Sequence, residues 1–106
     1  MNEGLPPVTG SWTHSFEEDK AEYEVYRPTD TFPFPLSRRG RETLEFSHGG
    51  EMRMEEPGPD DRLYIKKCTW SSIGKNRFVI SGVEVEGERI VEILDAKPDL
   101  LKIRHV

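Results

Sequence analysis

Apolar and polar side chains alternate along most of this chain, and glycine or proline interrupts the alternation at short intervals. In residues 12–16 the large rings fall at alternate positions, so Trp12, His14 and Phe16 are expected to share one face of a strand. The same period of two recurs in roughly eight short segments, and no segment has a convincing helical period. The pattern therefore predicts an all-β chain.

Turn signals separate these segments and favour hairpins between consecutive strands. The clearest is Ser47-His48-Gly49-Gly50, where two glycines can adopt positive φ at little cost. The expected strands are 12–16, 23–26, 42–46, a return strand around 52–54, 63–70, 77–80, 83–85, 89–94 and 100–104. Regular hairpins favour a small antiparallel up-and-down barrel of about eight strands, because closure removes exposed edges. We expect the first strand to lie beside the last.

The chain divides into a lead-in, residues 1–9, and one barrel domain, residues 10–106. Pro6 and Pro7 prevent regular structure in the lead-in. The stretch 28–40, called the proline loop below, contains Phe32-Pro33-Phe34-Pro35 and cannot be a central strand, since proline lacks the ladder donor. Long loops inside compact domains are often functional lids or packed loops.

Composition narrows the function. The net charge of −5 disfavours general nucleic-acid binding, which depends on neutralising phosphates. Cys68 is the only cysteine, so no intramolecular disulfide can form, and neither a signal peptide nor a membrane-spanning run is visible. We expect a cytoplasmic protein without membrane association, either a monomer or a homodimer. Arg38, Arg39 and Arg41 form a local basic cluster that could bind an anion, be solvated, or contact acidic neighbours on the surface.

Several short motifs together resemble the calycin superfamily, and within it the small bacterial lipocalin-like domains. They are Gly10-Ser11-Trp12, Phe46-Ser47-His48-Gly49-Gly50, Thr69-Trp70-Ser71 followed by Asn76-Arg77-Phe78-Val79-Ile80, and a closing strand pair running from Ile93 through Asp99, Leu101 and Ile103. The resemblance implies that Trp12 packs at the closed end of the barrel under a basic side chain of the last strand, Arg104 or else Lys102, in a cation–π contact. The chain is shorter than a secreted lipocalin, and the proline loop has no counterpart in the family.

The resemblance also implies a ligand, a small and largely apolar molecule held in the barrel. The expected ligand-binding residues are His14, Tyr26, Arg27, Phe32, Phe34 and Trp70. We expect no cofactor, no metal site and no catalytic constellation. The histidines lie far apart, on different elements.

Each candidate has a plainer alternative. His14 could be a general base or a polar ligand contact, or a core histidine that bonds to a neighbour. Arg27 could clamp an anion or form a surface ion pair. Phe32 and Phe34 could cover a pocket, fill a gap in the barrel or face a partner.

Three functions therefore stay open: a ligand-binding barrel, an interaction module that uses loop 28–41, and a small enzyme with His14 as base. A cavity of ~300 Å³ or more would favour the ligand, and a filled barrel with exposed Phe32 and Phe34 would favour a partner.

Overall fold

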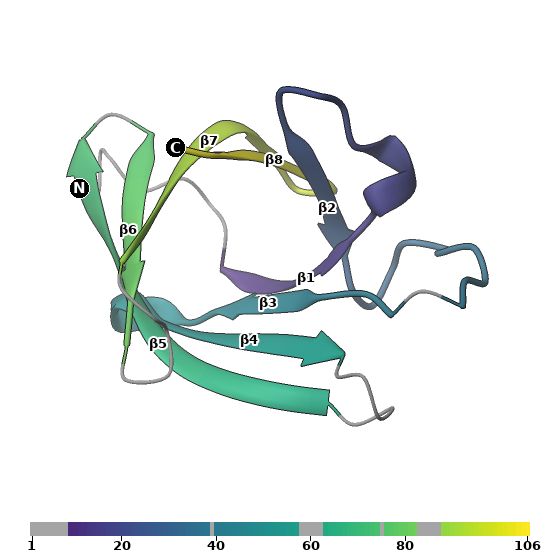
Figure 1. The fold of residues 1–106 in the computed structure, drawn as a ribbon, viewed down its shortest axis with the longest axis horizontal. Coiled ribbons are helices and arrows are strands. Elements are labelled where there is room, and N and C mark those ends of the chain that lie inside the picture. The colour runs from purple at the N-terminus through teal and green to yellow at the C-terminus, as the bar shows by residue number, and fades with distance from the viewer. Residues whose placement is uncertain (1–8, 39, 58–62, 75, 83–87) are drawn as a thin grey trace.

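Eight strands form a closed antiparallel barrel in the computed structural model, which describes residues 9–38, 40–57, 63–74, 76–82 and 88–106 (Figure 1). The strands are β1 (Gly10–His14), β2 (Glu24–Pro28), β3 (Thr43–Phe46), β4 (Glu51–Pro57), β5 (Leu63–Gly74), β6 (Arg77–Ser81), β7 (Arg89–Lys97) and β8 (Leu100–His105). The described helical elements are two 3-10 turns, η1 (Phe16–Glu18) and η2 (His48–Gly50). The predicted eight-stranded, antiparallel up-and-down barrel is confirmed. The strand expected at residues 83–85 lies outside the described residues.

The order of the strands differs from the expected one at a single place. Strands β3 to β8 follow one another around the barrel, and the β1–β2 hairpin closes the remaining gap with β2 against β8 and β1 against β3. The expectation that the first strand lies beside the last is therefore wrong. The proline loop explains the difference, because a connection of this length lets the chain pass the end of β1 and pair β3 on its far side. A tight turn after β2 would have placed β3 directly beside β2.

The interior of the barrel is filled by the inward rows of the strands. Trp12 is 4% exposed, which confirms that this ring is buried. The core consists of Trp12, Tyr26, Leu44, Phe46, Met52, Met54, Cys68, Phe78, Ile80, Val91, Ile93, Leu101 and Ile103, with Trp70 and Ala96 packed against it.

The basic side chains of β8 do not cover Trp12. Leu101 and Ile103 face the core, so strict alternation turns Lys102 and Arg104 to the outer face of the barrel. Arg104 pairs there with Glu92 of β7, and the Lys102 ammonium lies 4.8 Å from the centre of the Tyr23 ring. The cation–π contact that the resemblance implied for Trp12 is therefore wrong for both of these side chains.

Two local features follow from the turn chemistry. Gly49 and Gly50 have φ values of 86° and 85° at the β3–β4 turn, as predicted for this sequence. The first strand ends earlier than expected, at His14, because the chain turns into η1 at Phe16. The Glu18 amide donates to the Ser15 carbonyl at 2.9 Å, and the Ser15 hydroxyl donates to the Glu18 carboxylate at 2.7 Å. Phe16 therefore leaves the row that begins with Trp12 and His14.

Candidate functional site

One end of the barrel opens into a narrow apolar cavity of about 40 Å³. This volume is well below the ~300 Å³ of a typical ligand pocket, so the cavity size that would favour a ligand is not reached. In the shape observed, the cavity holds only a few small atoms. Its described lining is Tyr26, Glu42, Leu44, Phe46, Met54, Trp70, Phe78, Ile80, Arg89, Val91, Ile93, Leu101, Ile103 and His105. The walls are thus almost entirely apolar, and the charged side chains are few.

Trp70 places a buried indole N–H in these walls. Its indole packs between two core rings, with centroids 5.2 Å from Phe46 and 5.0 Å from Phe78. The Nε1 atom is buried, and no acceptor in the described part of the chain hydrogen-bonds to it. A buried donor without an acceptor costs about 1–3 kcal/mol. An acceptor atom brought in by a bound molecule would recover part of that free energy.

The mouth of the cavity is made by charged residues at one end of the strands. Glu42, Arg89 and His105 line the cavity, and Glu24 contacts His105 beside it. These four residues, called the rim below, continue the inward rows that hold Tyr26, Leu44, Val91 and Ile103. Since neighbouring strands are antiparallel, the first residues of β2, β3 and β7 meet the last residues of β8 at the same end. Trp12, in the middle of β1, is not part of the described lining.

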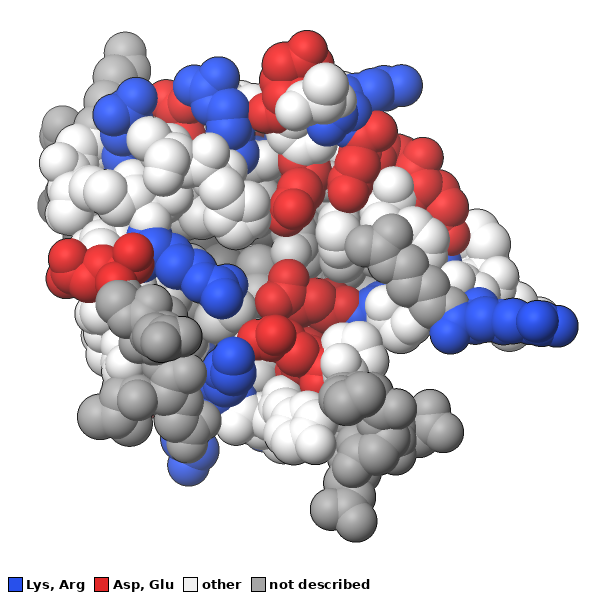
Figure 2. Space-filling view, viewed as in Figure 1, with Lys and Arg blue, Asp and Glu red and all other residues white. Residues whose placement is uncertain are grey.

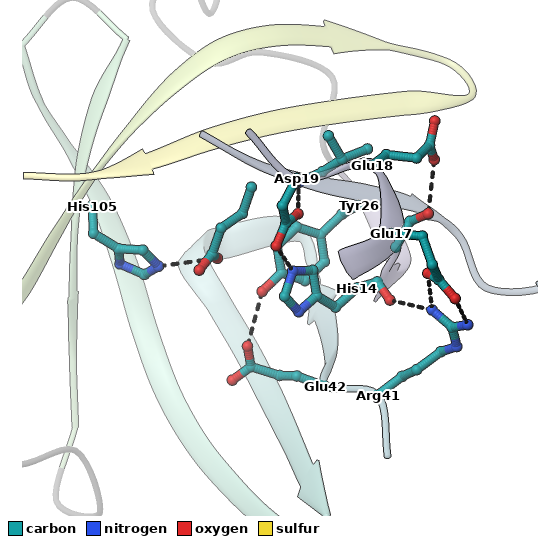
Figure 3. Close-up of polar contacts among 11 residues, drawn as sticks. His14, Glu17, Glu18, Asp19, Tyr26, Arg41, Glu42 and His105 are labelled. Carbon is teal, nitrogen blue, oxygen red and sulfur yellow. Dashed lines mark hydrogen bonds and ion pairs between the residues drawn. The ribbon is translucent and has the colours of Figure 1, made fainter. Parts of the chain in front are cut away.

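Tyr26 connects the core to the rim. It is 1% exposed, and its hydroxyl donates a 2.8 Å hydrogen bond to Oε1 of Glu42 (Figure 3). Burial, followed by the charge of Glu42, raises the pKa of the Tyr26 phenol far above its usual range. The phenol is therefore neutral and acts as a fixed hydrogen-bond donor that orients the Glu42 carboxylate.

No described Lys or Arg pairs with Glu42, and among the described side chains only Tyr26 hydrogen-bonds to its carboxylate. The charge of Glu42 also contributes to the raised pKa of His105, which lines the same cavity. The other rim acid, Glu24, lies 3.2 Å from Nε2 of His105. That contact raises the pKa of His105. Figure 2 shows acidic side chains gathered over the middle of the face seen in Figure 1. The mouth therefore combines an apolar interior with a carboxylate that has no Lys or Arg partner among the described residues.

His14 lies behind Tyr26 and forms a pair with Asp19. Its Nε2 donates to Oδ2 of Asp19 at 2.8 Å, and Oδ1 of Asp19 accepts the Val25 amide at 2.8 Å. A histidine held by a carboxylate is suited to act as a base. The ring faces Tyr26 rather than the cavity, however, and the described lining of the cavity does not include His14. The contact with Asp19 matches the plainer reading of His14, a core histidine bonded to a neighbour.

The proline loop is attached to the outside of the barrel by two arginines. Arg27 binds both carboxylate oxygens of Glu18, at 2.7 and 2.9 Å, and this pairing lowers the pKa of Glu18 to about 2. Arg41 binds both carboxylate oxygens of Glu17, at 2.6 and 2.9 Å, and also donates to the Pro35 carbonyl at 3.0 Å. Bidentate pairs of this kind fix geometry as well as adding energy.

The same two guanidinium groups cover the phenylalanines of the loop. Arg27 lies 5.0 Å from the Phe32 ring centre, and Arg41 lies 5.1 Å from that of Phe34. The two rings pack edge to face, 4.8 Å apart, and both are half-buried. Arg38 is exposed and Arg39 lies outside the described residues, so the basic cluster expected at 38–41 is represented by Arg41, which is paired with Glu17.

The structure thus divides the six residues expected to bind ligand into three groups. Tyr26 and Trp70 line the cavity, and His14 packs behind Tyr26. Arg27, Phe32 and Phe34 lie together outside the barrel, and none of them belongs to the described lining.

Sequence reasoning missed the rim. The alternation could have predicted part of it, because Glu42 has the same phase as Leu44 and Phe46 and is therefore expected on the inward face. Charged residues at the ends of inward rows mark an open end of a barrel.

Comparisons with protein-family models, with curated proteins and with solved structures find no match to this chain. No helix in the described ranges has the length and apolar character needed to cross a membrane.

Proposed function

We propose that this protein is a lipocalin-like binding protein that holds a small, largely apolar molecule in the mouth of its barrel. The observation that carries the proposal is the buried indole N–H of Trp70, which has no described acceptor in the wall of an otherwise apolar cavity. A preferred molecule has an apolar body and one hydrogen-bond acceptor directed at Trp70. Tyr26, on the same wall, contributes ring surface and holds Glu42 at the opening.

The size of the cavity limits the molecule. A volume of about 40 Å³ cannot take a lipid or a large pigment without rearrangement. Met54 belongs to the lining, and methionine is an adaptable side chain, so the cavity can widen by rotamer changes. We therefore expect a ligand of about six heavy atoms.

A matched pair of probes tests the proposal. Cyclopentanone and methylenecyclopentane have nearly the same shape, but only the ketone carries an acceptor. Titration of each probe, followed by amide and indole chemical shifts in NMR, should show tighter binding of the ketone and a shift of the Trp70 indole proton. Trp70→Phe keeps the ring and removes the donor, so this variant should bind both probes equally.

Native mass spectrometry of the purified protein would also reveal a co-purified ligand. If the wild-type protein binds neither probe and carries no co-purified molecule, the proposal fails.

The second candidate is an interaction module that uses loop 28–41. It is favoured by Leu36, whose side chain is fully exposed next to the half-buried Phe34. Arg41 ties the loop to Glu17 and to the Pro35 carbonyl, and Arg27 covers the Phe32 ring. These contacts favour one shape of the loop, which suits recognition by a partner. Substitution of Leu36 separates the two functions, because this residue is not part of the described cavity lining.

A further inference from the structure

We infer that the molecule bound in the barrel is a primary amine, with its apolar body in the cavity and its ammonium group on the carboxylate of Glu42. The inference rests on the proposed function and adds the chemical class of the ligand. It starts from the position of Glu42, which lines the apolar cavity and has no Lys or Arg partner among the described residues.

The hydrogen bond from Tyr26 makes Glu42 a prepared site rather than a loose surface acid. The 2.8 Å bond occupies Oε1 and leaves Oε2 available for a ligand. The phenol is neutral and cannot cancel the charge of the carboxylate. A carboxylate next to an apolar cavity is less solvated than one on an open surface, so an ammonium group gains more there than in bulk water.

The other charges around the mouth favour the same sign of ligand. Asp19 and Glu24 add negative charge near the Tyr26 hydroxyl. His105 is paired with Glu24, and His14 is paired with Asp19. Neither imidazole hydrogen-bonds to Glu42, although the charge of Glu42 also helps to raise the pKa of His105. Arg89 is the one described guanidinium in the cavity lining, and it is exposed to solvent. It would attract a carboxylate instead, which makes it the natural comparison in the experiment.

Three probes with one ring test the inference: cyclopentylmethylamine, cyclopentylmethanol and cyclopentanecarboxylate. At pH 7 the amine should bind about tenfold more tightly than the alcohol, and the carboxylate should bind most weakly. Glu42→Gln keeps an acceptor for the Tyr26 hydroxyl and removes the charge, so it should bring the amine and the alcohol to within about threefold of each other. Arg53→Gln changes an exposed arginine outside the described cavity lining and should leave the preference for the amine in place.

The outcomes distinguish the inference from the function on which it rests. Equal binding of amine and alcohol by the wild-type protein overturns the inference and leaves the binding function standing. Tighter binding of the carboxylate, lost in Arg89→Gln, also overturns it. If none of the three probes binds, the proposed function fails and the inference fails with it. Should Glu42→Gln not fold, the salt dependence of the wild-type protein decides: the preference for the amine must fall between 20 mM and 500 mM salt, and a constant preference overturns the inference.

Discussion

The ring of His14 lies flat against the ring of Tyr26, with 4.9 Å between centroids and 18° between planes. The two residues are direct cross-strand neighbours on β1 and β2. On one side of the stack His14 binds Asp19, which follows η1, and on the other side Tyr26 binds Glu42 at the mouth. The stack therefore links the turn outside the barrel to the carboxylate at its opening. A substitution of Tyr26 should change the surroundings of both Asp19 and Glu42.

Tyr26→Phe tests the polar half of this link. The phenylalanine keeps the ring and its stacking on His14, but Glu42 loses its donor. We expect the free energy of unfolding to fall by about 1–2 kcal/mol, measured by urea denaturation. Tyr23→Phe is the matched control, because Tyr23 is half-buried and presents its ring to Lys102. Equal losses in the two variants would show that the bond to Glu42 contributes nothing specific.

Trp12→Ala tests how much the buried Trp12 ring contributes to the stability of the barrel. Trp12 is 4% exposed and belongs to the core, so its removal leaves a large cavity. We expect a loss of ~3–5 kcal/mol in the free energy of unfolding. The midpoint of a denaturant titration measures it, with Trp12→Phe as a milder comparison. A midpoint that barely moves would show that this ring is not structural.

The period of two was sufficient to predict the barrel. Each row of alternating apolar residues can bury only one face, so Leu44 and Phe46, or Leu101 and Ile103, had to point inward. Alternation does not state which strand lies beside which. The pairing of β1 with β3 depends on the path of the proline loop, and that path is fixed by contacts between residues far apart in sequence, such as Arg41 with Glu17.

The candidate site was predicted only in part, for the same reason. Tyr26 and Trp70 lie on inward rows, and they line the cavity. The rings of Phe32 and Phe34 gave no such indication, because a loop has no alternation from which to infer a face. Their arginine partners were recognisable as charges, but not as the groups that would cover these rings.

The pair between Arg27 and Glu18 predicts a pH dependence of stability. Arg27 lowers the pKa of Glu18 from 4.5 to about 2, so the folded state favours the ionised carboxylate. The contribution is fully present above pH 4.5 and is lost as the pH falls from there towards 2. The difference in melting temperature between the wild-type protein and Arg27→Gln should therefore be largest at neutral pH and shrink towards pH 2. A part that does not depend on pH remains, because Arg27 also donates to the Asp99 carbonyl.

Arg53→Gln is the control for this titration, since Arg53 forms a longer and more exposed pair with Glu45, at 3.4 Å. Its effect on the melting temperature should be small at every pH. A difference between wild type and Arg27→Gln that stays constant from pH 7 to pH 2 would contradict the assignment to Glu18.

Gly40 marks a close approach between the end of the proline loop and β4. A Cβ atom at this position would lie 2.5 Å from Cβ of Pro57, a ring atom that cannot rotate away. Gly40→Ala should therefore lower stability by about 1–3 kcal/mol, measured by thermal denaturation. Gly74→Ala is the matched control, because nothing lies within 4 Å of a Cβ atom there. If both variants melt alike, the loop is not held against β4 in solution.

Phe34→Ala separates the possible roles of the proline loop. The ring is half-buried between Phe32 and Arg41 and lies outside the described cavity lining. We expect the variant to lose about 1 kcal/mol of stability and to bind cyclopentanone as the wild-type protein does. Leu36→Ala, which removes a fully exposed side chain, should leave the melting temperature unchanged. Weaker binding of cyclopentanone by Phe34→Ala would instead show that the loop covers the mouth. If both variants elute later than the wild-type protein from a sizing column, the loop is a contact surface between two copies of the chain.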